Sequence, residues 1–192
     1  MQGKASTGGM GIDIDAGVEI AVLKEVQAWT ADKYQSDEQE VILCFVWELE
    51  DNAGELVTLH DNFVRLTRDR DGFPVLNENS KLYNRLAALY GREIAVAAEL
   101  SWEIEFPRAY DSPEGLETLP HFSQRRDIDP VKVKAIVVEG VALLGREAQI
   151  NIVEKNGYMN VKDASAMPRR KAKPVRDLEP IREDESVDAL PV

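Results

Sequence analysis

The stretch Glu40–Glu50, EVILCFVWELE, decides how this sequence folds. Its β-branched and aromatic residues are typical of β-strands. Both alternating sets of side chains are apolar, which predicts a central strand covered on both of its faces. The turn sequence DNAG follows at residues 51–54, and Glu55–Thr67 then supplies a partner strand. Residues 40–67 are therefore predicted to form a hairpin.

Two side chains in the middle of the central strand are assigned to the core. Trp47 has apolar neighbours on both faces of the strand. Cys44 lies between large apolar residues, so we expect a buried and unreactive thiol rather than a nucleophile. Because Cys44 is the single cysteine, the chain has no internal disulfide, and a reducing compartment is expected.

Working outward, the flanking segments predict further strands and one helix. Gly17–Trp29 begins with alternating apolar residues and predicts a long first strand, followed by a polar loop at 31–39. Asn79 or Ser80 can cap a helix that runs to Tyr90 and stops at Gly91. Near the end of the chain, the turn Lys155–Gly157 separates two strands over 147–153 and 158–166.

The segment between Gly91 and Gly145 gives weaker signals. Ile94–Phe106 fits either a helix or a strand, and Asp111–Arg126 is expected to be a loop. Pro130–Leu144 has room for a short helix and a strand. We treat residues 92–144 as an insertion of undetermined fold.

The order of elements predicts the fold class. Three antiparallel strands, a helix and a closing hairpin match the order of an OB-fold, a β-barrel in which a helix lies between strands three and four. The prediction is a mainly β protein, an OB-fold barrel with one or more helices in the insertion between those strands. Immunoglobulin-like sandwiches usually lack such a helix and need about seven strands.

Length, composition and charge set limits on the class of protein. The 192 residues carry 35 acidic and 23 basic side chains, a net charge of −12. The expected organisation is a disordered N-terminus at 1–11, an OB-fold domain at 12–168 and a disordered tail at 169–192. No apolar run is long enough for a membrane span, and the N-terminus lacks the apolar core of a secretory signal. The expected location is the cytoplasm of a bacterial host cell, with no membrane partner.

Short motifs, in order along the chain, resemble a known family. They are Gly17, Trp47-Glu48-Leu49, Ser80-Lys81-Leu82 with Leu89-Tyr90-Gly91, Leu144-Gly145-Arg146, Asn156-Gly157-Tyr158 and Met167-Pro168. Together they resemble phage-encoded OB-fold proteins of the single-stranded-DNA-binding type. The resemblance covers about residues 16–168. It implies a non-catalytic protein of a phage or prophage module for DNA replication or recombination.

A single-strand-binding protein needs aromatic side chains on which bases stack and nearby cations for the phosphates. In OB-folds these gather on strands two and three and on the loops after strands one and four. The candidate nucleic-acid-binding residues are Trp29, Tyr34, Phe63, Arg65, Arg68, Lys155 and Tyr158. Trp29, Phe63 and Tyr158 are equally compatible with packing roles. The arginines at 65, 68 and 70 alternate with Asp69 and Asp71, which favours a self-neutralising surface loop.

Catalysis finds little support in the sequence. The two histidines, His60 and His121, have no second metal ligand at a suitable spacing, and a structural role is favoured for both. Asp69-Arg70-Asp71-Gly72 resembles part of a calcium loop, but position twelve is Ser80 instead of a glutamate. We expect no enzyme activity, no cofactor and no metal.

The tail from residue 169 onward is basic first and then acidic. Five cations lie within Arg169–Arg176, and six carboxylates follow up to Asp188. By the resemblance, Asp184, Glu185, Asp188 and Leu190 are predicted to recruit replication or recombination proteins, and a plain solubilising tail is the alternative. The tail has six charges of each sign, so the whole excess of negative charge belongs to residues 1–168. This acidity motivates a second hypothesis, an acidic OB-fold protein-interaction module or inhibitor that binds no nucleic acid.

Overall fold

The computed structural model of the chain describes residues 13–95 and 102–168. The N-terminal segment and the C-terminal tail, including Asp184, Glu185, Asp188 and Leu190, lie outside these residues. The described part is mainly β, as predicted, with two antiparallel sheets. The main sheet has the strand order β3-β2-β1-β8-β9, and the short strand β5 also pairs with β1.

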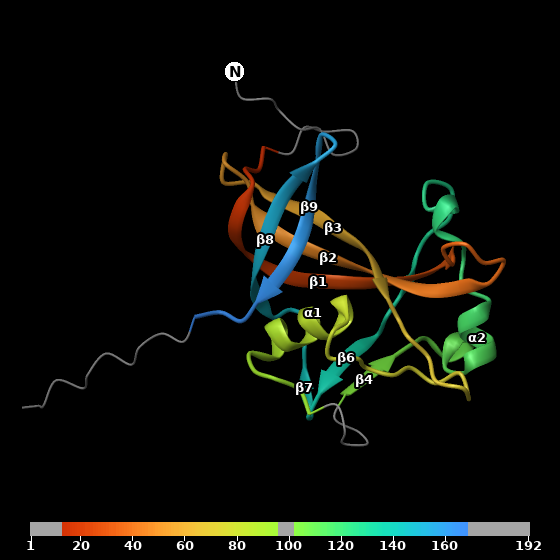
Figure 1. Cartoon of the computed structure of the whole chain (residues 1–192). Helices are drawn as coiled ribbons and strands as arrows, with labels where there is room; N and C mark the ends of the chain where they lie inside the picture. Colours follow the sequence, from red (N-terminus) through yellow and green to blue (C-terminus); the bar gives the residue numbers. More distant parts are fainter. Residues whose placement is uncertain (1–12, 96–101, 169–192) are drawn as a thin grey trace, which may run out of the picture.

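Strand β1 (Gly17–Asp32) holds the main sheet together (Figure 1). Its first half pairs with β8 (Glu147–Lys155), from Gly17 opposite Ile152 to Val22 opposite Glu147. From Val22 onward it pairs with β2 (Gln39–Glu50). A register shift between Leu23 and Glu25 falls where β1 changes partners, as expected of a bulge that bends a strand.

The predicted hairpin over 40–67 is confirmed by β2 and β3 (Leu56–Arg65). Trp47 and Cys44 are both buried, as predicted. Trp47 belongs to the main core inside the bent sheet, whereas Cys44 lies on the opposite face of β2 in a second, smaller cluster. Strand β2 is therefore covered on both of its faces.

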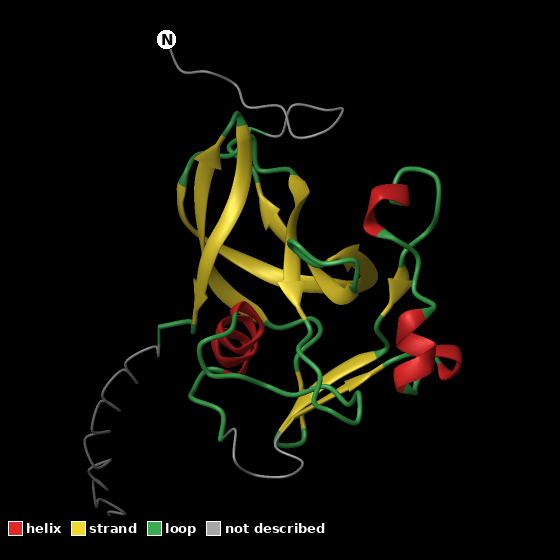
Figure 2. Cartoon of the chain, turned by 45° about the vertical axis from the view of Figure 1, so that its right-hand side comes forward, coloured by secondary structure: helices red, strands yellow, loops and turns green. Residues whose placement is uncertain are grey.

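Helix α1 (Lys81–Tyr90) begins and ends where the sequence predicts. The Ser80 hydroxyl accepts a hydrogen bond from the Tyr83 amide at 3.0 Å, and Gly91 ends the helix with φ of 87°. Its apolar stripe, Leu82, Leu86 and Leu89, is buried in the main core. Figure 2 shows the helix against one end of the main sheet.

Helix α1 also connects β3 to β9 (Tyr158–Ser165), the two end strands of the main sheet. The Asn84 side chain accepts from the Ala164 amide and donates to the Ala164 carbonyl, both at 3.0 Å. Arg85 donates to the carbonyls of Val161 and Lys162 on β9 and to Asp61 on β3. The two side chains thus satisfy backbone groups of β9 that no neighbouring strand pairs within the described residues.

The insertion forms a second sheet and several short helical turns. Strands β4 (Trp102–Glu105), β6 (Ala135–Val138) and β7 (Val141–Ala142) make the sheet. The connecting residues form η1 (Arg108–Tyr110), α2 (Pro113–Glu117), η2 (Phe122–Gln124) and β5 (Val131–Lys132). The loop predicted over 111–126 therefore contains α2 and η2. Residues 130–144, which had room for a short helix and a strand, form three short strands. These elements are too short to show a periodicity in the sequence.

The closing hairpin is confirmed. Asn156 and Gly157 both have positive φ, 55° and 76°, as a two-residue turn between right-twisted strands requires. The tip of this hairpin lies at the top of Figure 1, whereas the loop between β1 and β2 lies at its right.

Candidate nucleic-acid interface

Phe63, near the end of β3, carries an exposed aromatic ring. Between the pairs Leu43–Val64 and Phe45–Asp61, strand β3 has one more residue than β2, so Asn62 and Phe63 form a bulge opposite Cys44. Phe63 has φ of 60°, a left-handed conformation that is rare for a bulky residue. Its side chain is 54% exposed. Strain of this kind is concentrated at binding sites in proteins, which makes Phe63 a candidate contact residue.

A second ring, from the insertion, lies beside Phe63. The ring centroids of Phe63 and Phe122 are 4.8 Å apart at an interplanar angle of 65°. Phe122 also meets Trp29 edge to face, with centroids 6.0 Å apart. The ring of Phe122 therefore lies between an exposed phenylalanine and a buried tryptophan.

The segment that carries Phe122 is fixed to β1 on both sides of η2. The Thr30 amide donates to the Pro120 carbonyl at 3.0 Å, and the Thr30 hydroxyl donates to Leu119 at 3.2 Å. Downstream, Val131 and Lys132 pair with Ala28 and Gln27. The residues between these attachments form a short loop on the outer face of the sheet, so Phe122 is held in place by backbone hydrogen bonds.

Arg125 supplies a cation to this pair of rings. Its guanidinium carbon lies 4.5 Å from the centroid of Phe122, and one nitrogen donates to the Phe122 carbonyl at 3.3 Å. Within the described residues, neither Arg125 nor Arg126 has a carboxylate within 4.0 Å. We call Phe63, Phe122 and Arg125 the aromatic platform. In single-strand-binding proteins, aromatic faces and nearby cations are the kinds of group that stack on bases and contact phosphates.

Trp29, predicted to stack on bases, does not belong to the exposed surface. Its side chain is 2% exposed and packs with Ile42, Cys44 and Val46 under Phe122. Strand β1 continues to Asp32, beyond the predicted end at Trp29, and so carries Trp29 within the sheet. Of the two roles considered for Trp29, base stacking and packing, the structure supports packing.

The arginines predicted near the end of β3 are paired with carboxylates. Arg65 lies 3.0 Å from Glu40, and Arg68 lies 3.5 Å from Glu117 on α2. Both border a groove of about 730 Å³ that also contains Lys33, Arg70 and six acidic side chains. This arrangement matches the self-neutralising alternative, so the groove has no excess of positive charge among the described residues.

The remaining predicted contacts lie in two separate places. Tyr34 is exposed in the loop between β1 and β2, at the platform end of the sheet. Lys155 and Tyr158 flank the β8–β9 turn and are exposed. Because β8 ends opposite the start of β1, these two residues lie at the other end of β1 from Tyr34. The structure does not gather all seven predicted residues into one site.

Sequence reasoning missed Phe122 and Arg125. Both lie in FSQRR, residues 122–126, an aromatic residue followed by two cations. That local pattern is a recognisable signal for a nucleic-acid contact, but only the fold shows that it lies beside Phe63.

A polar cluster lies on the same face of the sheet as Trp29. The Cys44 sulfur is 3.6 Å from Nδ1 of His60. Burial raises the pKa of the Cys44 thiol to about 12, with a smaller effect from Asp61. Burial also lowers the pKa of His60, against the effect of Glu25. A neutral thiol is a poor nucleophile, so the pair is suited to packing and not to covalent chemistry.

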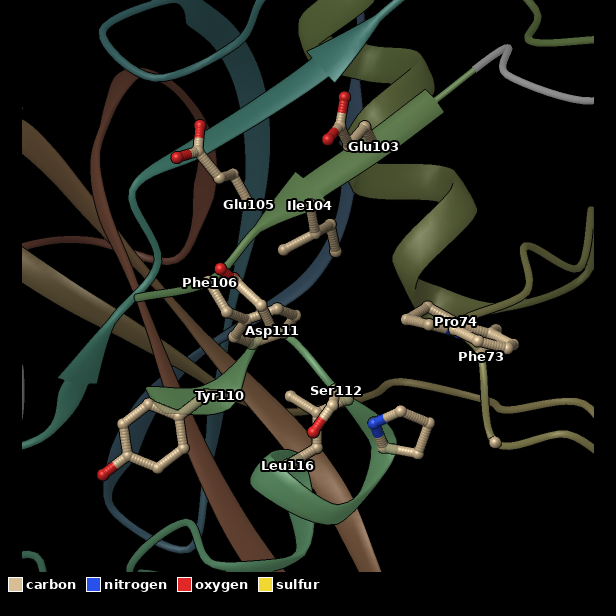
Figure 3. Close-up of a pocket in the computed structure, with 12 residues that line it drawn as sticks. Phe73, Pro74, Glu103, Ile104, Glu105, Phe106, Tyr110, Asp111, Ser112 and Leu116 are labelled. Carbon is tan, nitrogen blue, oxygen red and sulfur yellow. The ribbon is translucent and has the colours of Figure 1, made fainter. Parts of the chain in front are cut away.

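A separate pocket of about 250 Å³ lies between the insertion and the loop before α1 (Figure 3). Its walls combine aromatic and apolar side chains with the carboxylates of Glu103, Glu105 and Asp111. None of the described residues that line it is a lysine, arginine or histidine. Phe73, 56% exposed, stands at its edge opposite β4.

Comparison with known proteins gives no assignment: no protein-family model matches this sequence, and no curated protein is significantly similar to it. The described residues contain no group of three or more potential metal ligands from histidine, cysteine and carboxylates. Neither of the two described α-helices is long and apolar enough to cross a membrane.

Proposed function

We propose that this chain is a non-catalytic OB-fold protein that binds single-stranded DNA in a phage or prophage replication or recombination module. The strand order β3-β2-β1-β8-β9, with α1 between β3 and β8 in the sequence, supports the OB-fold assignment. The insertion at 92–144 then lies between the third and fourth barrel strands. The acidic tail residues Asp184, Glu185, Asp188 and Leu190 recruit partner proteins in this proposal.

The observation that carries the proposal is the aromatic platform. Phe63 offers an exposed ring, and Arg125 offers a guanidinium stacked on Phe122. Stacking of a base on an aromatic side chain contributes about 1–3 kcal/mol. In a duplex the faces of the bases are already stacked on each other, so the platform selects single strands.

The charge of the protein determines how this binding responds to salt. With a net charge of −12 and most cations near the platform already paired, few phosphates are neutralised. The logarithm of the affinity then changes only slightly with the logarithm of salt concentration, because that slope counts the neutralised phosphates. The proposed binding is led by stacking.

The test is fluorescence anisotropy of a labelled oligo-dT strand titrated with the full chain, at several salt concentrations and with a duplex as competitor. We expect single-strand binding at low salt that Phe63→Ala weakens by about 5- to 150-fold, the equivalent of one stacking contact. Phe73→Ala is the matched control, because Phe73 has nearly the same exposure but lies outside the platform. Absence of single-strand binding at low salt, or equal losses for both variants, would overturn the proposal.

A protein-interaction role is a second candidate, supported by the pocket at Phe73. Glu103 and Asp111 beside aromatic walls, with Glu105 already 3.5 Å from Lys134, suit an arginine or lysine side chain from a partner protein. The volume of about 250 Å³ is below that of most small-molecule sites and fits a side chain of a docked segment. Calorimetry with a penta-arginine peptide tests this role. Phe73→Ala and Glu103→Gln are expected to weaken binding, whereas Phe63→Ala leaves it unchanged. Equal effects of all three variants argue against the pocket.

A further inference from the structure

We propose that Lys81 is a positioning residue that holds Phe63 in the conformation needed for stacking, an inference that rests on the proposed function. Lys81 is the first residue of α1 and the middle residue of the Ser80-Lys81-Leu82 motif. Its ammonium donates to the backbone carbonyl of Asn62 at 2.8 Å. It thereby contacts the residue directly before Phe63.

The Lys81 ammonium also forms an ion pair with the buried carboxylate of Asp61. Lys81 Nζ lies 2.6 Å from Oδ1 of Asp61, and Arg85 Nε lies 2.6 Å from Oδ2 of the same carboxylate. Asp61 is on β3 next to Asn62, and its side chain faces α1 on the core side of the sheet. Lys81 and Arg85, one helical turn apart, therefore both bind the Asp61 side chain. Lys81 also binds the Asn62 carbonyl at the start of the bulge.

The bulge needs these contacts because its backbone conformation is unfavourable. A phenylalanine with φ of 60° has its Cβ close to backbone atoms, so an extended conformation is preferred unless the surroundings prevent it. On the outer side the Phe63 ring packs against Phe122 and remains more than half exposed. The hydrogen bond from Lys81 acts on the peptide group between Asn62 and Phe63, which is the group that must rotate if Phe63 returns to an extended conformation.

This arrangement assigns a role to each residue of the motif. Ser80 caps α1, Leu82 packs in the main core, and Lys81 connects the helix to the bulge. The platform is then preorganised, so ordering of Phe63 does not reduce the free energy of binding a base.

The test combines nuclear magnetic resonance with DNA binding for Lys81→Met, Lys81→Arg and Lys24→Met in the full chain. The first readout, which needs no DNA, is the three-bond coupling between the amide and α protons of Phe63 together with the amide order parameters of residues 62–64. We expect Lys81→Met to change the coupling and lower the order, and Lys81→Arg to preserve both because it keeps the donors. Lys24→Met removes an ammonium from the Lys24–Glu48 ion pair, outside the bulge, and controls for loss of charge.

The second readout is affinity for the oligo-dT strand. Lys81→Met is expected to lose about 5- to 150-fold, as Phe63→Ala does, with the double variant no weaker than either single one. If Lys81→Met fails to fold, Lys81→Ala, which also removes the hydrogen-bond donor, replaces it in both measurements. Unchanged coupling and order in the Met or Ala variant overturn the inference. A changed bulge in a protein that binds no DNA at all leaves the positioning role standing and overturns the proposed function instead.

Discussion

The Arg85 guanidinium donates through Nε to Oδ2 of Asp61 at 2.6 Å, and both side chains are almost completely buried. Arg85→Met leaves this buried carboxylate with Lys81 as its one remaining cation among the described residues and removes the hydrogen bonds to Val161 and Lys162, so it is expected to lower the free energy of unfolding by about 3–5 kcal/mol. The urea denaturation midpoint, compared at constant m-value, measures this loss. At the exposed Lys24–Glu48 pair, Lys24→Met is expected to change stability by less than about 1 kcal/mol. Equal small effects at both pairs would show that the buried pair does not stabilise the fold.

Phe63 provides a second test, of strain in the bulge. Glycine adopts positive φ without a steric penalty, whereas alanine does not. Phe63→Gly is therefore expected to be more stable than Phe63→Ala by about 1 kcal/mol. Thermal unfolding of the two variants checks the order. A more stable alanine variant would mean that residue 63 is extended in solution.

The reassignment of Trp29 from a binding residue to a packing residue predicts a large effect on stability. Trp29→Ala removes a buried indole from beneath Phe122 and is expected to cost about 3–5 kcal/mol. Denaturant unfolding of this variant beside Phe73→Ala, which removes an exposed ring, gives the comparison. A loss at residue 29 no greater than that at residue 73 contradicts the packing role.

The polar cluster of Cys44, His60 and Glu25 predicts how stability depends on pH. Burial lowers the pKa of His60 below its usual 6.5, with Glu25 opposing. The unfolded chain then takes up a proton at a higher pH than the folded chain does. The stabilising contribution of neutral His60 is therefore complete above about pH 6.5 and is lost as the pH falls below that value. His60→Gln is expected to flatten the stability curve between about pH 7 and 5.

A carboxylate in the same cluster acts at lower pH. Burial alone would raise the pKa of Glu25, but hydrogen bonds with Lys132 and Gln27 outweigh it and the pKa is lowered. Its contribution is present above the usual carboxylate range and is lost as the pH falls through the lowered value. The stability of the His60→Gln variant is therefore still expected to fall at the low pH where Glu25 is protonated. Identical curves for wild type and His60→Gln across pH 7 to 5 would contradict the effect of burial on His60.

Cys44 gives a chemical test of the same region. With its pKa raised to about 12 and its side chain buried, the thiol is expected to react with Ellman's reagent only after unfolding. The measurement is the labelling rate in native buffer and in urea. Rapid labelling of the native protein would mean that the outer face of β2 is open to solvent.

The sequence allowed prediction of those elements whose signals are local. Ser80 and Gly91 mark the ends of α1 because caps act within one helical turn, and Asn156-Gly157 marks the last hairpin because both residues accept positive φ. The central strand was recognisable since its apolar residues fill both faces. The insertion was not, because strands of two to four residues show no period.

The candidate site was only partly predictable for the same reason. The exposed ring of Phe63 was proposed from the sequence, but its contact with Phe122 joins residues from distant parts of the chain. Neither the bulge at Asn62–Phe63 nor the ion pairs of Arg65 and Arg68 can be inferred from neighbouring residues. They depend on strand register and on where the insertion packs.

The pairing of β1 with β8 has a consequence for synthesis of the protein. The first half of β1, Gly17–Val22, finds its partner only when Glu147–Ile152 has left the ribosome. At about 5–20 residues per second, this leaves the early strand without that neighbour for on the order of 10 s. During that time β2 and β3 can already pair with the later part of β1. The nascent chain therefore carries an open strand edge along Gly17–Val22, with unpaired backbone groups, until β8 is synthesised.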